Sequence, residues 1–158
     1  MKARVCFFIL SFVMLFNTVV FAEKTQSDDI DAKAYILIEQ STGRVLAENN
    51  ADEQLPIASV TKIMTMLLIM EAIEDRKTSF DDLVTVSENA MSYGGSTMFL
   101  ETGEQLPVHD MLKGIAVASA NDGCVAMAEH LTGSETAFVE EMNKRAKELG
   151  MKNSAFKN

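Results

Sequence analysis

The regular pattern of apolar and polar residues begins with two short apolar runs separated by a polar segment. Residues 34–39 and 45–48 are β-prone, and residues 41–44 between them contain Gly43. Glycine adopts positive φ without steric cost, as tight hairpin turns require. We therefore expect a β-hairpin here, and a further short apolar run occupies residues 83–86.

Helical patterns dominate the rest of the chain. Residues 59–73 follow Pro56 and are apolar on more than one face, which predicts a central, buried helix. A second helix is expected at about residues 107–118, where a proline occupies the first turn and apolar residues recur at helical spacing.

Two more helices have clear stop signals. The first covers about residues 122–131 and ends before Gly133. Ser134 can cap the second, at residues 135–149, in which acidic residues come early, basic residues come late and a glycine follows. Strands at the front followed by several helices predict an α/β or α+β layered fold.

The first 22 residues have the pattern of an export signal. Lys2 and Arg4 precede the almost wholly apolar residues 5–21, and Ala22 is a small residue suited to cleavage. The alternative is an uncleaved membrane anchor, but three polar residues interrupt a stretch already short for a span of about 20 residues. We expect a mature chain outside the cytoplasmic membrane, with the polar residues 23–31 as a flexible lead-in.

The composition narrows the function classes. The 158 residues include 14 Lys and Arg against 23 Asp and Glu, a formal net charge of -9, and loss of Lys2 and Arg4 with the signal would make it -11. Such a chain lacks the basic surface that binds phosphate backbones, so we expect no nucleic-acid partner. Cys6 would leave with the signal, so Cys124 would be alone and no internal disulfide could form.

The chemistry concentrates in residues 54–70, where Lys62 is the only charged residue. Burial disfavours the charged form of an ammonium group, so an apolar setting favours a lysine that can act as a base. Ser59 comes three residues earlier and would lie on the same helix face. The pair has the geometry of a nucleophile and its general base.

A purely structural interpretation of this pair is also available. Serine is a good helix cap, lysine side chains reach the surface from apolar ground, and Ser-x-x-Lys recurs by chance. Ser154 and Lys157 form a second match, with neither a following apolar helix nor a charge-free setting. It is the chargeless context that favours Ser59 and Lys62.

A second candidate is Ser119-Ala120-Asn121, at the junction of two predicted helices. A junction can present a hydroxyl and an amide to a cleft. The same residues could simply cap the following helix, and Ser87-Glu88-Asn89 repeats the spacing elsewhere in the chain.

Taken in order, these segments resemble the penicillin-recognising serine enzymes, whose signature is Ser-x-x-Lys, then Ser-x-Asn, then Lys-Thr-Gly. Residues 56–65 look like the nucleophile segment of D-alanyl-D-alanine carboxypeptidases, the low-molecular-mass penicillin-binding proteins. Further similar segments are residues 34–48, 94–96, 119–122, 126–130 and 150–154. The resemblance covers residues 32–158 and implies the N-terminal portion of a β-lactamase/transpeptidase-like serine domain.

The resemblance also implies a mechanism. Ser59 would attack a peptidoglycan stem peptide and release its terminal D-alanine, with Lys62 as general base, Ser119 as proton relay and Asn121 as a substrate-binding residue. β-Lactams would acylate the same serine. No cofactor or metal is implied, and His109 and His130 look like isolated, exposed helix residues.

The third motif of the family has no match in this sequence. Lys77-Thr78-Ser79 is the nearest string, but it precedes Ser119 instead of following it. We therefore expect the front part of a carboxypeptidase, with any membrane-surface association residing in a missing C-terminal region. The alternatives are a truncated, inactive remnant or binding module and, disfavoured by Ala120, a class A β-lactamase.

Overall fold

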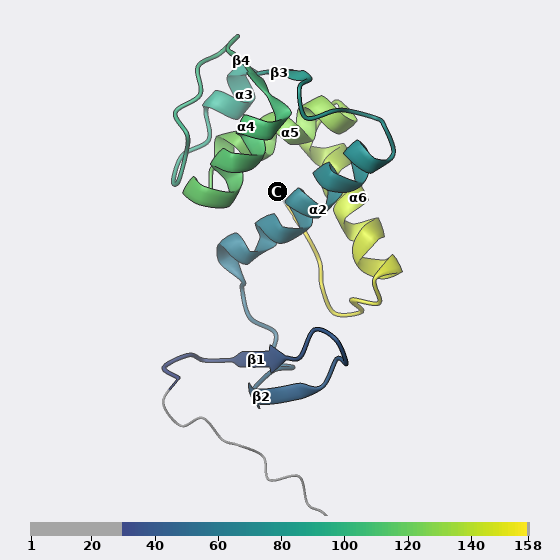
Figure 1. Cartoon of the computed structure of the whole chain (residues 1–158). Coiled ribbons are helices and arrows are strands. Elements are labelled where there is room, and N and C mark those ends of the chain that lie inside the picture. The colour runs from purple at the N-terminus through teal and green to yellow at the C-terminus, as the bar shows by residue number, and fades with distance from the viewer. Residues whose placement is uncertain (1–29, 158) are drawn as a thin grey trace, which may run out of the picture. The chain divides into compact units, whose positions relative to one another are not determined.

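The computed structural model describes residues 30–157, shown in colour in Figure 1. The expected export signal at residues 1–22 and most of the expected lead-in lie outside the described residues. The chain divides into two units between Glu53 and Gln54, and each is described here by itself. Among residues 30–157, no helix has both the length and the apolar character needed to cross a bilayer.

The first unit is the predicted β-hairpin. Strands β1 (Tyr35–Ile38) and β2 (Val45–Asn49) pair antiparallel, with the register shifting by a bulge next to Ile38. Gly43 takes φ +71° in the turn, and its N–H donates to the carbonyl of Glu39. The glycine therefore has the role that the sequence predicted.

The second unit begins with the helix expected at residues 59–73, but in two parts. A 3₁₀ turn, η1 (Ala58–Thr61), leads into α2 (Lys62–Glu74). The predicted burial is correct for one face of α2, where Met64 and Ile69 are buried, and wrong for the other. Because α5 and α6 pack on one side only, Ile63 on the opposite face is 62% exposed.

A small sheet and a short helix follow. Strand β3 (Leu83–Thr85) lies in the run expected at 83–86 and pairs antiparallel with β4 (Gln105–Pro107). Between them, α3 (Glu88–Met91) is capped by Ser87, whose hydroxyl accepts the Ala90 N–H. The sequence did not predict β4 or α3. Segments of three or four residues are too short to show a recognisable alternation or helical period.

The remaining helices match the predictions closely. The helix expected at 107–118 is α4 (Val108–Lys113), which continues as a π-helical stretch, η2 (Gly114–Ala118). Helices α5 (Asn121–Thr132) and α6 (Glu135–Glu148) follow, the latter capped by Ser134. The predicted α/β or α+β class is confirmed, because the described residues form several helices and two separate two-stranded antiparallel sheets.

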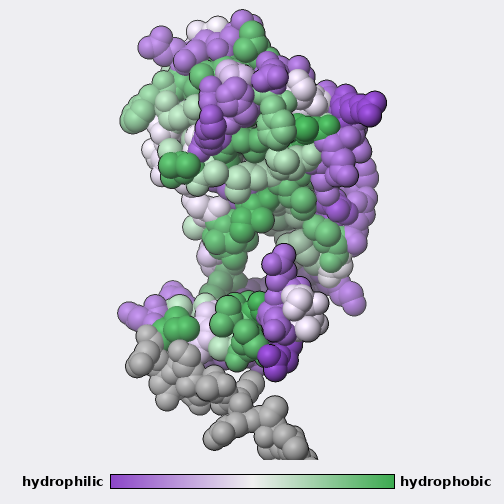
Figure 2. Space-filling view, viewed as in Figure 1, coloured by the Kyte–Doolittle hydropathy of each residue, from purple (hydrophilic) through white to green (hydrophobic). Residues whose placement is uncertain are grey.

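The core of this unit lies around α5, which packs against α2, α3, α4 and α6. Its largest fully buried apolar side chains are Ile69, Val84, Val86, Val108, Met111, Ile115 and Met127. Figure 2 shows many hydrophilic side chains along the edge of this unit where α6 runs, with apolar side chains beside them. The core thus fixes α5 and α2 against each other, and the candidate site residues lie at the beginnings of these two helices.

Candidate active site

Ser59 and Lys62 come together through local structure. Ser59 lies in the η1 turn, directly after Ala58 at φ +45°, and Lys62 is the first residue of α2. Side chains three residues apart are nearly eclipsed in a 3₁₀ turn. Accordingly, the Lys62 ammonium donates to the Ser59 hydroxyl over 3.4 Å. Ser59 is exposed and Lys62 is half-buried.

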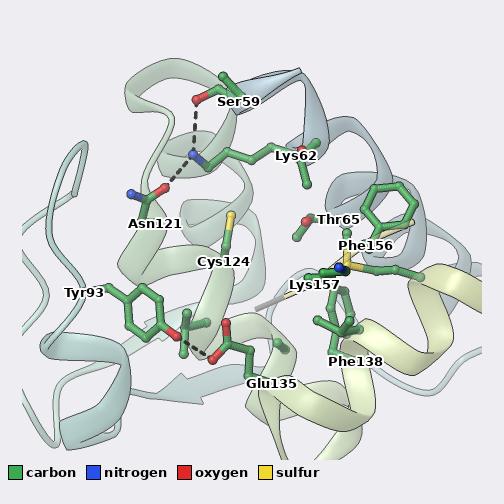
Figure 3. Close-up of a pocket in the computed structure, with 16 residues that line it drawn as sticks. Ser59, Lys62, Thr65, Tyr93, Asn121, Cys124, Glu135, Phe138, Phe156 and Lys157 are labelled. Carbon is green, nitrogen blue, oxygen red and sulfur yellow. Dashed lines mark hydrogen bonds between the residues drawn. The ribbon is translucent and has the colours of Figure 1, made fainter. Parts of the chain in front are cut away.

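The other two predicted residues reach the same point from far along the chain. Ser119 ends η2 in the left-handed conformation, φ +55°, and Asn121 begins α5. Lys62 Nζ lies 3.0 Å from Ser119 Oγ and 2.6 Å from Asn121 Oδ1, and Ser119 Oγ lies 2.9 Å from Ser59 Oγ. Figure 3 shows Ser59, Lys62 and Asn121 converging at one end of a cavity.

The distances define a path for a proton. The direct separation of Ser59 Oγ and Lys62 Nζ is 3.4 Å, while the two steps through the Ser119 hydroxyl are 2.9 and 3.0 Å. A hydroxyl can donate and accept at once. Ser119 is thus placed to pass a proton between the serine and the lysine over hydrogen bonds of ordinary length.

The side-chain amide of Asn121 is held at both ends. Its Oδ1 accepts from Lys62, and its Nδ2 donates to the Gly94 carbonyl over 2.8 Å. Its backbone N–H also donates to the Ser96 carbonyl. A Cβ on Gly95, which has φ +81°, would lie 3.0 Å from Asn121 Nδ2. Only a residue without a side chain lets the loop approach this amide so closely.

The next residue, Asp122, fixes the far side of the same loop. Its carboxylate is 1% exposed and accepts from the backbone N–H groups of Met98, Leu100 and Gly123. A buried carboxylate is tolerable only when such bonds satisfy it. Asn121 and Asp122 together therefore anchor the loop of residues 94–100 onto the start of α5.

The cavity beside these residues has a volume of about 450 Å³. Tyr93, Cys124 and Glu135 line it together with apolar residues of α6, and Lys157 reaches it from the end of the described chain. Burial raises the pKa of the Cys124 thiol to about 11, against the opposing effect of the nearby Lys62 charge. The thiol is thus a poor nucleophile near neutral pH, because the thiolate is the reactive form.

The other motifs stand apart from this cluster. Lys77 pairs with Asp75, and the Thr78 hydroxyl donates to Asp82, in the turn after α2. Ser154 is exposed and belongs to no helix, although Lys157 of the same motif lines the cavity. Ser87 caps α3.

The histidines are less isolated than expected. His130 is exposed, and its Nε2 lies 3.1 Å from the Thr78 hydroxyl. His109 is half-buried, which corrects the expectation of an exposed residue, and its Nδ1 lies within hydrogen-bond distance of the Phe80 carbonyl oxygen, at 3.2 Å. Within residues 30–157, no group of His, Cys, Asp and Glu is arranged to hold a metal ion.

Two site residues escaped the sequence analysis. Tyr93 and Glu135 line the cavity and are joined by a hydrogen bond. Their separation of 42 residues leaves no local pattern that could pair them. The only signal was the position of Tyr93 directly before the Gly94-Gly95 pair.

Comparison with known proteins places these observations in a family context. A family model described as D-alanyl-D-alanine carboxypeptidase matches residues 21–158. The D-alanyl-D-alanine carboxypeptidase DacF of Bacillus subtilis is 59% identical over 128 residues, 81% of this chain and 33% of DacF. DacA of Escherichia coli is 45% identical over 133 residues, 80% of this chain and 33% of DacA. The chain thus spans about a third of the length of these curated relatives.

Solved structures agree with the sequence relatives. The D-alanyl-D-alanine carboxypeptidase DacD of Francisella tularensis matches with a TM-score of 0.80 and 38% identity, over 82% of this chain and 32% of that one. Penicillin-binding protein D2 of Listeria monocytogenes, in its ampicillin-bound form, matches with a TM-score of 0.68 and 31% identity, over 77% and 48% of the two chains. The described fold is therefore a portion of the one that these proteins share.

Proposed function

This chain belongs to the D-alanyl-D-alanine carboxypeptidase family, and on that premise we propose that it acts as a serine-type enzyme on peptidoglycan stem peptides. The reaction would remove the terminal D-alanine through an acyl-enzyme on Ser59. The observation that carries the proposal is the cluster of Ser59, Lys62, Ser119 and Asn121 at the end of one cavity. Four residues with complementary roles within hydrogen-bond reach are what acyl transfer requires.

The distances support a first half of the proposed reaction that forms an acyl-enzyme. Ser59 Oγ attacks the carbonyl carbon of the penultimate D-alanine, and its proton passes to Lys62 Nζ directly or through Ser119. The tetrahedral intermediate then collapses, the peptide C–N bond breaks, and the leaving amine takes a proton delivered through Ser119. D-Alanine departs, and Ser59 carries the rest of the stem peptide as an ester.

The second half returns the enzyme to its starting state. Water attacks the ester carbonyl and gives up a proton to the Lys62 amine, and Ser59 leaves as the alcohol. Asn121 is proposed to hydrogen-bond the substrate backbone, since its side chain lines the cavity and contacts Lys62, the proposed base of Ser59. Backbone N–H groups at the start of a helix lack intrahelical partners and would favour the developing oxyanion.

The same chemistry proposes β-lactams as inhibitors. A strained lactam carbonyl presented to Ser59 would form an ester in the same way, with no D-alanine to release. The ampicillin-bound state of the similar Listeria protein supports this proposal. Formation of such an ester would distinguish an enzyme from a module that only binds a peptide, because a binding module forms no covalent bond with its ligand.

We further propose the organisation expected from the sequence. Residues 1–22 would be an export signal, residues 23–31 a lead-in, and residues 32–158 an N-terminal portion of the catalytic domain, working in the cell envelope outside the cytoplasmic membrane. The match of the family model to residues 21–158 supports the assignment of residues 32–158 to the catalytic domain.

Labelling with a fluorescent penicillin tests the proposal. We expect the protein to form a covalent adduct whose mass maps to the peptide containing Ser59, and Ser59→Ala to reduce labelling to background. Ser154→Ala is the matched control, because Ser154 belongs to the second Ser-x-x-Lys string but is exposed and outside the cluster. It should label like the wild type. Absence of a Ser59-dependent adduct on folded protein would overturn the proposal for this chain, whereas D-alanine release from a stem-peptide analogue would extend it to turnover.

A further inference from the structure

A hydrogen bond in the lining of the cavity joins two parts of the chain that the reaction does not use directly. The Tyr93 hydroxyl donates to Glu135 Oε2 over 2.5 Å. Tyr93 immediately precedes the glycine loop, and Glu135 is the first residue of α6. Both side chains are half-buried and line the cavity that also contains Ser59 and Lys62. Figure 3 shows the two side chains pointing toward each other.

The Tyr93–Glu135 bond is linked to Lys62 through Gly94 and Asn121. Tyr93 is covalently joined to Gly94, whose carbonyl accepts the Asn121 Nδ2–H over 2.8 Å. The other end of that amide, Oδ1, lies 2.6 Å from Lys62 Nζ. Movement of Tyr93 would therefore displace the Gly94 carbonyl, release Asn121 and leave Lys62 without one of its three acceptors.

The loop needs such an anchor because of its sequence. Gly94 and Gly95 are successive residues with the greatest backbone freedom, and Gly95 has φ +81°. On the C-terminal side, the loop is held by the Ser96 carbonyl and by Asp122. On the N-terminal side, the Tyr93 hydroxyl supplies the side-chain bond. The terminal torsion of an asparagine has a broad energy profile, so Asn121 keeps its orientation only while both of its partners stay in place.

We propose that Tyr93 and Glu135 are a positioning pair, which holds the Gly94 carbonyl against Asn121 and thereby sets Lys62 for proton transfer with Ser59. The inference rests on the proposed acyl transfer at Ser59. Neither residue touches the reacting atoms, so both act through Asn121 and Lys62.

The ionisation of Tyr93 suits this role. The hydrogen bond to Glu135, with burial as a further cause, raises the pKa of the Tyr93 hydroxyl. The phenol consequently remains a donor throughout the neutral pH range. A bond from a hydroxyl to a carboxylate is stronger than one between neutral groups, so it can restrain a glycine loop.

A purely structural contact would have different consequences, and the chain offers a control. Asn89 Nδ2 donates to Glu129 Oε1 over 2.9 Å, which also joins the α3 region to a later helix. Neither residue lines the cavity. Loss of the Asn89–Glu129 bond should lower stability about as much as loss of the Tyr93–Glu135 bond does, but it should leave the orientation of the Asn121 side chain unchanged.

The kinetic test uses Tyr93→Phe, Glu135→Ala, Glu135→Gln and the control Asn89→Ala. We expect Tyr93→Phe and Glu135→Ala to slow the first-order acylation step at Ser59 about tenfold, as loss of one hydrogen bond of this strength implies, with the penicillin dissociation constant unchanged. The variant that combines Tyr93→Phe with Glu135→Ala should be acylated no more slowly than either single variant, because both substitutions remove the same hydrogen bond. Glu135→Gln keeps an acceptor oxygen and should recover most of the rate, and Asn89→Ala should stay within about twofold.

A second readout does not depend on turnover. In ¹H–¹⁵N spectra, the side-chain amide signals of Asn121 should shift and broaden in Tyr93→Phe and Glu135→Ala, and stay in place in Asn89→Ala. Unchanged signals, or acylation at the wild-type rate in Tyr93→Phe, would overturn the positioning role. So would additive losses in the double variant. If the wild type forms no Ser59 adduct, the proposed function fails, and the Asn121 signals still decide whether the pair positions the amide.

Discussion

Two residues with unusual backbone conformations help to position the side chains of this site. Ser119 adopts φ +55°, a region that costs a non-glycine residue about 1 kcal/mol or more. In return, its hydroxyl lies within 3.0 Å of both Lys62 Nζ and Ser59 Oγ. Ala58, the residue before the nucleophile, is also at positive φ, +45°. The backbone is thus strained directly before Ser59 and at Ser119 itself, as is common where the surrounding structure must hold functional groups in place.

Cys124 gives a prediction at the same scale. Because burial raises the pKa of its thiol to about 11, the thiolate fraction near pH 8 should be about 100-fold below that of an ordinary cysteine. Alkylation by iodoacetamide, followed at Cys124 by peptide mass mapping, should be correspondingly slow in the native protein. The rate should rise about tenfold for each pH unit up to about 11.

The same thiol affects stability with a defined sign. An unfolded chain loses the thiol proton near the usual pKa of 9, whereas the native state keeps it to about 11. The contribution of Cys124 to the unfolding free energy is therefore complete below pH 9 and declines as the pH rises toward 11. Urea unfolding of the wild type and Cys124→Ala should show their difference shrinking over this interval. Alkylation as fast in native protein as in urea would contradict the assignment.

At the scale of elements, the start of α5 organises the loop of residues 94–100. Asp122 supplies acceptors for three backbone N–H groups, and those of Met98 and Leu100 belong to the loop. Asp122→Ala would leave these buried donors without partners, at about 1–3 kcal/mol for each group. We expect a loss of roughly 3 kcal/mol or more in the unfolding free energy, measured in urea.

A half-buried acid near the surface of a neighbouring helix provides the comparison. Asp110 pairs with Lys113 on the surface of α4, an interaction worth at most about 0.5 kcal/mol. Asp110→Ala should therefore change the urea concentration at the midpoint of unfolding only slightly. If Asp122→Ala were equally mild, the carboxylate would not be what holds the loop, and Asn121 would need another support.

At the scale of the whole molecule, the two units differ in how much side-chain surface they bury. Most residues of β1 and β2 are exposed, whereas α5 includes six buried positions. A two-stranded hairpin has little stability of its own. By hydrogen exchange with mass spectrometry, we expect amides of β1 and β2 to exchange at least about 100-fold faster than those in the middle of α5. Equal protection would show that the hairpin unfolds together with the core of the other unit.

Prediction from sequence succeeded where a signal was local. The hairpin was marked by Gly43, α6 by Ser134 and Gly150, and the end of α5 by Gly133, because caps and turns depend on a few adjacent residues. Helix α3 and strand β4 were missed, since three or four residues carry no detectable period. The all-round burial predicted for α2 failed because apolar composition does not say which faces the neighbouring helices cover.

The sequence by itself determined the proximity of Ser59 and Lys62, because three residues along a helical turn fix that distance without help from the rest of the chain. Tertiary structure alone decided that Ser119 and Asn121, 57 and 59 residues after Lys62, meet its ammonium group. It also decided that Glu135 meets Tyr93. These contacts depend on how the buried faces of α2, α5 and α6 pack, and the packing of a core is a property of many side chains together.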